Sequence, residues 1–172
     1  MAKSALLGVA IAALVLSAGA IGGGVYMFFI HQPSPSYGTL YMNEDYSETT
    51  SGFHIVPFNA GIGGGVGRNL TRNALVIETW GHYHVDVCIT FNNTVDSEFY
   101  GAYLRFYDTG EDLLVSQVCG TDGNVTTACI SGRLYLHEGD ELVLYAVTSN
   151  PTGFQAAGDD VSRYTFVSVV LY

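Results

Sequence analysis

Basic side chains are scarce in this chain of 172 residues. It has six lysines and arginines against sixteen aspartates and glutamates, and its formal net charge is −10. The single lysine, Lys3, lies near the N-terminus. Binding to a nucleic-acid backbone requires a basic face that neutralises the phosphates. The composition therefore excludes nucleic acid as a partner.

Other common sequence features are also missing. The 21 glycines occur with only four prolines and without a Gly-X-Y repeat, which excludes a collagen triple helix. The sequence contains no G-x-S-x-G, H-E-x-x-H or C-x-x-C motif of the kind that marks hydrolases, zinc proteases and redox proteins. Because 48% of the residues are hydrophobic and 13% are aromatic, disorder is excluded as well. We therefore expect one folded, non-enzymatic domain without a cofactor.

The N-terminal part of the sequence contains a long apolar segment. Residues 5–30 carry no charged side chain. As a helix this segment would extend over roughly 39 Å, which exceeds the hydrocarbon core of about 30 Å. This predicts a single transmembrane helix in a lipid bilayer, with Lys3 keeping the N-terminus cytoplasmic and the domain on the extracellular, lumenal or capsid-facing side. A signal peptide cleaved after Ala20 is the alternative, because Ala18-Gly19-Ala20 matches the cleavage pattern.

The rest of the sequence divides into a linker and one domain. Two prolines in residues 31–39 predict a stiff linker, which leaves residues 40–172 for the domain. From Tyr83 to Phe91, every second residue is apolar, which is typical of a strand with one buried face. Similar short runs separated by glycine turns predict an antiparallel sandwich or barrel. The expected strands are 54–58, 75–79, 82–91, 102–107, 113–118, 132–136, 141–148 and 164–172.

Four segments of this domain resemble the C1q and tumour-necrosis-factor-like (TNF-like) family. Residues 76–85 are similar to a long strand that begins with Gly-x-Tyr, and residues 55–59 to an early strand. Residues 134–144 resemble a hairpin with a Gly-Asp turn, and residues 164–172 resemble the last strand. The matches occur in the family's order and cover residues 40–172. They imply an all-β, antiparallel jelly-roll sandwich of ten strands that assembles into a homotrimer.

The resemblance also implies candidates for the trimer interface. In the family, aromatic and aliphatic side chains surround the threefold axis, so we expect Tyr83, Phe166 and Tyr172 to lie there. The alternative is that these three residues fill the core of a monomer. The sequence shows neither a collagen stalk nor a long tether, and it therefore departs from both secreted C1q-like proteins and TNF-like cytokines.

The expected anchor and short linker would hold the domain beside a membrane. We therefore expect a structural assembly protein, such as a minor capsid or membrane-to-shell component of a membrane-containing virion, with neighbouring coat proteins as partners. The first alternative is a C1q/TNF-like trimeric cell-surface ligand or adhesion protein. The second is a cupin-like metalloprotein, because His82 and His84 share one face of a strand. The glutamate that cupins carry a few residues later is missing from 85–91.

The three cysteines permit one intramolecular disulfide. Cys119 and Cys129 flank a turn-rich segment whose ends could close a hairpin. We therefore expect a disulfide between them. Cys88, which lies opposite the inward set of its strand, is expected to be a free thiol or a half-buried residue. The alternative is that all three cysteines are reduced.

Several remaining motifs are expected in loops. Asn-x-Thr sequons at Asn69, Asn92 and Asn124 are candidate glycosylation sites. The glycine cluster at 61–67 lacks the features of a phosphate-binding loop and predicts a flexible loop. Acidic turns such as 138–141 are expected to be solvated, with calcium binding as a minor alternative that the family resemblance allows.

Overall fold

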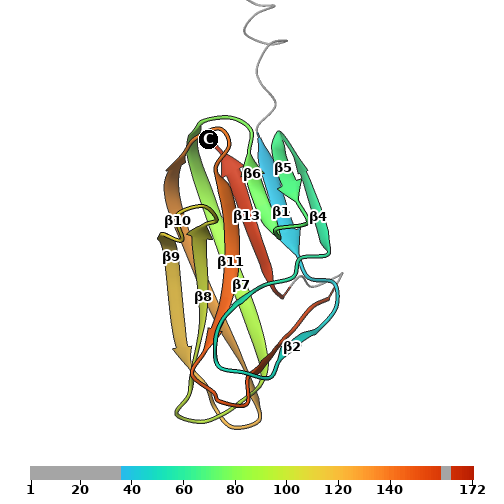
Figure 1. Ribbon diagram of the computed structural model, residues 1–172, viewed down its shortest axis with the longest axis vertical. Helices are drawn as coiled ribbons and strands as arrows, with labels where there is room; N and C mark the ends of the chain where they lie inside the picture. Colours follow the sequence, from blue (N-terminus) through green and yellow to red (C-terminus); the bar gives the residue numbers. More distant parts are fainter. Residues whose placement is uncertain (1–35, 160–163) are drawn as a thin grey trace, which may run out of the picture. The chain divides into compact units, whose positions relative to one another are not determined.

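A computed structural model describes residues 36–159 and 164–172, which form two antiparallel β-sheets packed face to face (Figure 1). These two ranges contain no helix that is long and apolar enough to cross a membrane. The predicted transmembrane helix at 5–30 and the alternative cleavage site at Ala20 lie outside the described residues. The strands are β1 (Tyr37–Tyr41), β2 (Tyr46–Glu48), β3 (Gly52–Ile55), β4 (Ala60–Gly64), β5 (Val66–Asn69), β6 (Ala74–Ile77), β7 (Gly81–Thr94), β8 (Phe99–Phe106), β9 (Asp112–Cys119), β10 (Asn124–Leu136), β11 (Glu141–Thr148), β12 (Phe154–Ala156) and β13 (Phe166–Leu171).

The first sheet, which we call sheet A, is built around the long strand β7. One edge of β7 pairs with β10 along almost its whole length. The other edge pairs with β13 and, further along, with β12. Next to β13 follow β1 and then β4, whereas β2 pairs with β12. Because β1 begins at Tyr37, the domain starts inside the segment predicted as linker.

The second sheet, sheet B, is built around β11. The strand order is β5-β6-β11-β8-β9, and β3 pairs with β11 beyond the end of β6. The observed β11 has the bounds that the sequence predicts, Glu141–Thr148. The described residues thus form an all-β sandwich of thirteen short and long strands rather than the ten that the resemblance implies.

The core lies between the two sheets. The inward side chains of β7 are at most 2% exposed, which confirms the predicted alternation; they are Tyr83, Val85, Val87, Ile89 and Phe91. Sheet B contributes fully buried leucines, namely Leu104, Leu142 and Leu144. Each large apolar side chain buried in this way stabilises the fold by about 1.5–3 kcal/mol. The shared core fixes which side chains of β7 must face solvent.

The glycine cluster at 61–67 is not a flexible loop, and this prediction is wrong. Residues 60–64 form β4, and residues 66–69 begin the edge of sheet B as β5. A Cβ atom on Gly63 would lie 2.6 Å from the carbonyl oxygen of Tyr37 and 2.8 Å from Cα of Gly38. Here the absence of a side chain lets two paired strands approach closely.

The predicted hairpin at 134–144 is also different from the observed structure. Its two strands form, but β10 pairs with β7 in sheet A and β11 pairs with strands of sheet B. The turn at Gly139, with φ of +90°, therefore carries the chain from one sheet to the other. Alternation along each strand indicates its buried face but not its partner.

A charged cluster ties the start of β11 to the end of β5. Nη1 of Arg72 donates a hydrogen bond of 2.8 Å to Oε2 of Glu141, and Nδ2 of Asn69 donates one of 3.3 Å to Oε1. The hydrogen bond from Arg72 lowers the pKa of Glu141; burial acts against this, and the bond from Asn69 adds to it. The guanidinium of Arg72 also lies 4.6 Å from the ring centre of Tyr107.

Replacing Glu141 with glutamine should lower the melting temperature at pH 7 by about 1–4 °C, because a partly exposed ion pair with Arg72 is lost. The pKa of Glu141 is lower in the folded state, so its stabilisation is present above the unfolded pKa of about 4.3 and is lost as the pH falls through the folded pKa. Thermal unfolding at pH 7 and pH 3 measures this. The exposed Glu138→Gln provides the control, and an equal effect of Glu141→Gln at both pH values would contradict the prediction.

Candidate functional site

The solvent-facing side of sheet A carries the candidate site. Side chains between the buried positions of β7 point away from the core and meet outward side chains of the neighbouring strands. In one row, Ser131 of β10, Asp86 of β7 and Ser168 of β13 lie side by side. In the row at the start of β7, Tyr135 lies opposite His82. The outward side chains of sheet A therefore form successive rows across the strands, and these rows differ in chemistry.

An aromatic cluster occupies one end of this face. We use this name for Trp80, His82, Tyr135, His137 and Tyr172. The ring centre of His82 lies 5.0 Å from that of Tyr135 and 6.2 Å from that of Tyr172. Trp80 lies 6.4 Å from Tyr135, which in turn lies 5.2 Å from His137. These residues come from the β6–β7 loop, β7, β10 and the segments after β10 and β13, which meet at the labelled C-terminal end in Figure 1.

The cluster is exposed although its residues are large. Trp80 is 64% exposed, Tyr172 is 62% exposed and Tyr135 is 47% exposed. The guanidinium carbon of Arg133 lies 5.3 Å from the ring centre of Tyr172. Tryptophan, tyrosine and arginine are the residue types enriched in the energetically important centres of protein interfaces. The outer face of sheet A therefore presents a surface suited to another protein.

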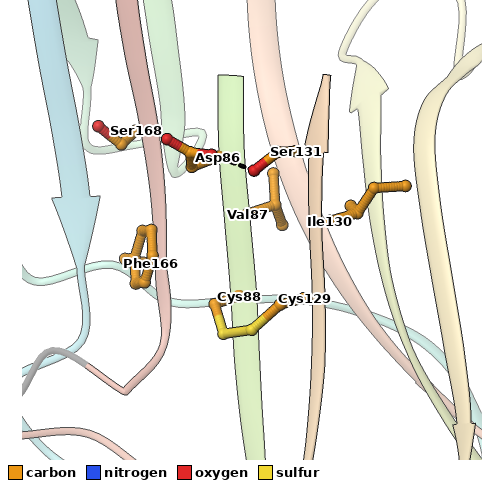
Figure 2. Close-up of a pocket in the computed structure, with 8 residues that line it drawn as sticks. All are labelled: Asp86, Val87, Cys88, Cys129, Ile130, Ser131, Phe166 and Ser168. Atoms are coloured by element: carbon orange, nitrogen blue, oxygen red, sulfur yellow. Dashed lines mark hydrogen bonds between the residues drawn. A yellow bond between two sulfur atoms is a disulfide. The ribbon is translucent and has the colours of Figure 1, made fainter. Parts of the chain in front are cut away.

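A shallow depression lies further along the same face (Figure 2). It has a volume of about 380 Å³ and is lined by residues of three adjacent strands, β10, β7 and β13. The hydroxyl of Ser131 donates a hydrogen bond to Oδ1 of Asp86 on one side, and Phe166 lies on another. A disulfide between Cys88 and Cys129 also lines it.

The observed disulfide corrects the predicted pairing. Cys88 is bonded to Cys129, and Cys119 is an exposed free thiol. After Cys119, which pairs with Phe99 in sheet B, the chain crosses to sheet A, where the register of β10 puts Cys129 opposite Cys88. The predicted Cys119–Cys129 disulfide and the predicted free thiol at Cys88 are therefore wrong.

The three predicted interface residues lie in different environments. Tyr83 is completely buried, and its hydroxyl donates a hydrogen bond of 2.6 Å to the carbonyl oxygen of Thr79. Burial raises its pKa. Tyr83 thus fills the core, as the alternative has it, and not an interface. Phe166 lies partly exposed beside the depression, Tyr172 belongs to the aromatic cluster, and their place in a trimer stays a prediction.

Sequence reasoning missed Tyr135, although its position between two inward leucines signals an outward aromatic residue.

The predicted histidine pair lies on the outer face of sheet A. Both side chains are exposed, and Nε2 of His84 lies 3.2 Å from Oδ1 of Asp86. His82 contacts aromatic rings instead. Within 36–159 and 164–172, no group of three or more histidines, cysteines or carboxylates is arranged to hold a metal ion. The structure therefore supplies no further ligand for the metal alternative.

The sequons do not all lie in loops, contrary to the prediction. Asn69 ends β5, Asn92 lies within β7 and Asn124 is the first residue of β10. The side chain of Asn69 already donates to Glu141, as described above, and accepts a hydrogen bond from the backbone N–H of Arg72. Asn124 is exposed. Glycosylation at these sites stays a prediction.

Comparison with known proteins identifies the fold. No protein-family model and no curated protein matches the sequence. Among solved structures, Eiger TNF from S. frugiperda is similar with a TM-score of 0.59 and 14% identity, over 81% of this chain and 94% of that chain. Murine APRIL at pH 5.0 is similar with a TM-score of 0.59 and 13% identity, over 81% of this chain and 100% of that chain. The chain has the fold of a TNF-like jelly roll.

Proposed function

We propose that this protein is a homotrimeric, TNF-like ligand or adhesion protein displayed at a cell surface. The observation that carries the proposal is the exposed aromatic cluster at one end of a TNF-like jelly roll. The similar structures are TNF-like jelly rolls and favour this function over the virion assembly role that the sequence led us to expect.

The aromatic cluster provides a contact through which three copies can associate. Its side chains leave large apolar areas in water, and burial of an aromatic side chain is a dominant source of interface energy. In a threefold arrangement, Trp80, Tyr135 and Tyr172 of each copy would pack near the axis. Each copy would contact the next in the same head-to-tail way, and a rotation of one third of a turn per copy closes the ring after three copies.

The distribution of charge also favours this end of the domain as the site of contact between copies. Each chain carries a net charge of −10, so three copies repel one another over most of their surfaces. The aromatic cluster contains no acidic side chain, and Arg133 and His84 lie in the next row of the sheet. Copies can therefore approach here with less repulsion than elsewhere.

Two further features fit display outside the cell. A disulfide such as Cys88–Cys129 persists in oxidising compartments and is rare in the cytosol. The apolar segment at 5–30, predicted from sequence to span a bilayer, would tether the trimer to the membrane. With the first strand beginning at Tyr37, the domain would stay near the lipid surface.

The oligomeric state of the purified full-length chain in mild detergent tests this proposal. Light scattering or sedimentation should give a trimer for the native chain and a monomer for the double variant Tyr135→Ser/Tyr172→Ser. Tyr164→Ser is the matched control, because Tyr164 is as exposed as Tyr135, 47% in each case, but lies outside the cluster. A monomeric native chain, or a trimer that survives the double substitution, would contradict the proposed assembly.

Cell binding tests the ligand role separately. Nanodiscs that carry the native full-length chain should bind cultured animal cells, and nanodiscs with the double variant should lose most of this binding. Because one trimer presents its receptor contacts three times, loss of the trimer removes avidity, which contributes about 10²–10⁴-fold to apparent affinity. Equal binding by native and variant chains would contradict a trimeric ligand.

A further inference from the structure

We propose that the Cys88–Cys129 disulfide is a redox modification site, which an external dithiol reductant opens by attack at the Cys129 sulfur. This inference does not depend on the proposed trimer. It follows from the position of the disulfide in sheet A, from the different exposure of its two cysteines, and from the strand pairing that continues on both sides of it.

The disulfide lies on the outer face of sheet A. Cys88 and Cys129 are directly opposite each other on β7 and β10, and both line the open depression (Figure 2). They alternate with buried residues of the same strands, so the sulfur atoms are on the side away from the core. A reductant can therefore reach the bond without opening the sandwich.

The two cysteines differ in exposure. Cys88 is only 9% exposed, whereas Cys129 is an exposed residue. Thiol–disulfide exchange requires the attacking thiolate to approach one sulfur in line with the bond, so access decides which sulfur is attacked. The structure therefore assigns attack to Cys129 and makes Cys88 the leaving thiolate.

The surrounding ladder does not need the disulfide to hold β7 and β10 together. Backbone pairing between these strands continues on both sides of it, from Thr94 opposite Asn124 to Gly81 opposite Leu136. Neighbouring residues such as Val87 and Ile89 stay anchored in the core. Reduction should thus change the surface of the depression and leave the sandwich folded.

The reaction is balanced as an ordinary two-electron exchange. One thiolate of the dithiol forms a bond to the Cys129 sulfur, the Cys88–Cys129 bond breaks, and Cys88 leaves as a thiolate that takes up a proton. The second thiolate of the reductant then attacks its own sulfur in the mixed disulfide. This releases Cys129 as a thiolate and leaves the reductant as a cyclic or intramolecular disulfide.

The neighbouring carboxylate influences which thiols react. Asp86 lies two residues before Cys88 on the same face, about 7 Å along the strand. Its negative charge repels a reductant that carries a further anionic group more strongly than a reductant whose only charge is the attacking thiolate. At that separation in water, the interaction corresponds to a change of about two- to threefold in rate. Neutral dithiols are therefore the favoured chemical class.

Thiol counting under native conditions tests accessibility. The full-length Cys119→Ser variant removes the exposed free thiol, and should show no maleimide-reactive thiol before treatment with dithiothreitol and two thiols afterwards. Its far-UV circular dichroism should keep the native β spectrum. If the two thiols appear only after denaturant has unfolded the domain, the proposal is wrong.

A monothiol identifies the attacked sulfur. Brief reaction of the same variant with 2-mercaptoethanol, acid quenching and cleavage after arginine separates the cysteines, because Cys88 lies in fragment 73–105 and Cys129 in fragment 106–133. The adduct should be found predominantly on fragment 106–133. A predominant adduct on fragment 73–105 would overturn the assignment.

Two matched variants complete the test. Asp86→Asn should raise the rate with anionic 2-mercaptoethanesulfonate about two- to threefold relative to the rate with 2-mercaptoethanol. The cluster variant Tyr135→Ser/Tyr172→Ser should leave the reduction rate unchanged, because six residues of β10, or about 20 Å, separate Tyr135 from Cys129. If Asp86→Asn does not change this ratio of rates, the assigned preference for neutral thiols is wrong. A rate change in the cluster variant would show that the site is not independent of assembly.

Discussion

Replacing Phe91 with alanine is expected to lower the free energy of unfolding by about 3–5 kcal/mol. Phe91 is completely buried. Its ring centre lies 5.2 Å from that of Tyr100 and 5.5 Å from that of Phe154, so the substitution leaves a cavity between strands of both sheets. Urea unfolding monitored by circular dichroism measures the loss.

Phe99→Ala is the control for this prediction. It deletes the same atoms from a side chain that is 38% exposed, so the expected loss is about 1 kcal/mol or less. The two variants have the same composition and charge, so the difference between their losses of unfolding free energy measures the effect of burial. A loss of less than 1 kcal/mol for Phe91→Ala would mean that the ring is not part of a close-packed core.

Replacing Gly153 with alanine is expected to cost about 2–5 kcal/mol. Gly153 has φ of +84°, a left-handed conformation that costs about 1–2 kcal/mol with any Cβ. A Cβ here would also lie 1.8 Å from the carbonyl oxygen of Glu48, a backbone atom of β2. The strand must therefore move away from β12, which adds about 1–3 kcal/mol as in other overpacked sites.

Gly123→Ala separates the two contributions to this loss. Gly123 has a similar φ of +67°, but a Cβ on it would have no atom within 4 Å. Its substitution should cost only the conformational part, about 1–2 kcal/mol. Thermal unfolding of both variants compares them directly. Equal losses would contradict the close approach of Gly153 to β2.

Much of the fold was predictable because buried strands alternate. The period of two from Tyr83 to Phe91 correctly identified the inward side of β7, and the apolar run from Glu141 to Thr148 gave β11 with its observed bounds. Both signals are local, since each depends only on which side of a pleated strand faces the core. The TNF-like order of segments then placed these strands in the correct fold class.

Pairing between distant strands was not predictable in the same way. Cys129 is bonded to Cys88 because of the register of β10 on β7, and no property of the residues between Cys119 and Cys129 reveals that register. The glycines at 61–67 were predicted to form a loop because their own sequence gives no sign of a partner strand. Their role depends on the approach of β1, a partner that lies elsewhere in the sequence.

The candidate site was only partly visible in the sequence. Tyr172 was expected at an interface and is exposed, whereas Tyr83 was expected there and is buried. Both are aromatic residues in strand-like segments, so residue type did not distinguish them. The aromatic cluster combines residues from three separate parts of the sequence, 80–82, 135–137 and 172, and only the assembled sheet shows that they meet.

The position of β13 has a consequence for biosynthesis. This strand lies between β1 and β7, so that the hydroxyls of Thr39 and Ser168, 129 positions apart, meet at 2.8 Å. Sheet A cannot close until residues 166–171 have left the ribosome, by which time β1 and β7 have long been synthesised. During that interval each has an unpaired edge, which is the kind of surface that recruits strands of other nascent chains. We therefore expect the folding yield of the domain to fall when many copies are translated close together on one messenger RNA.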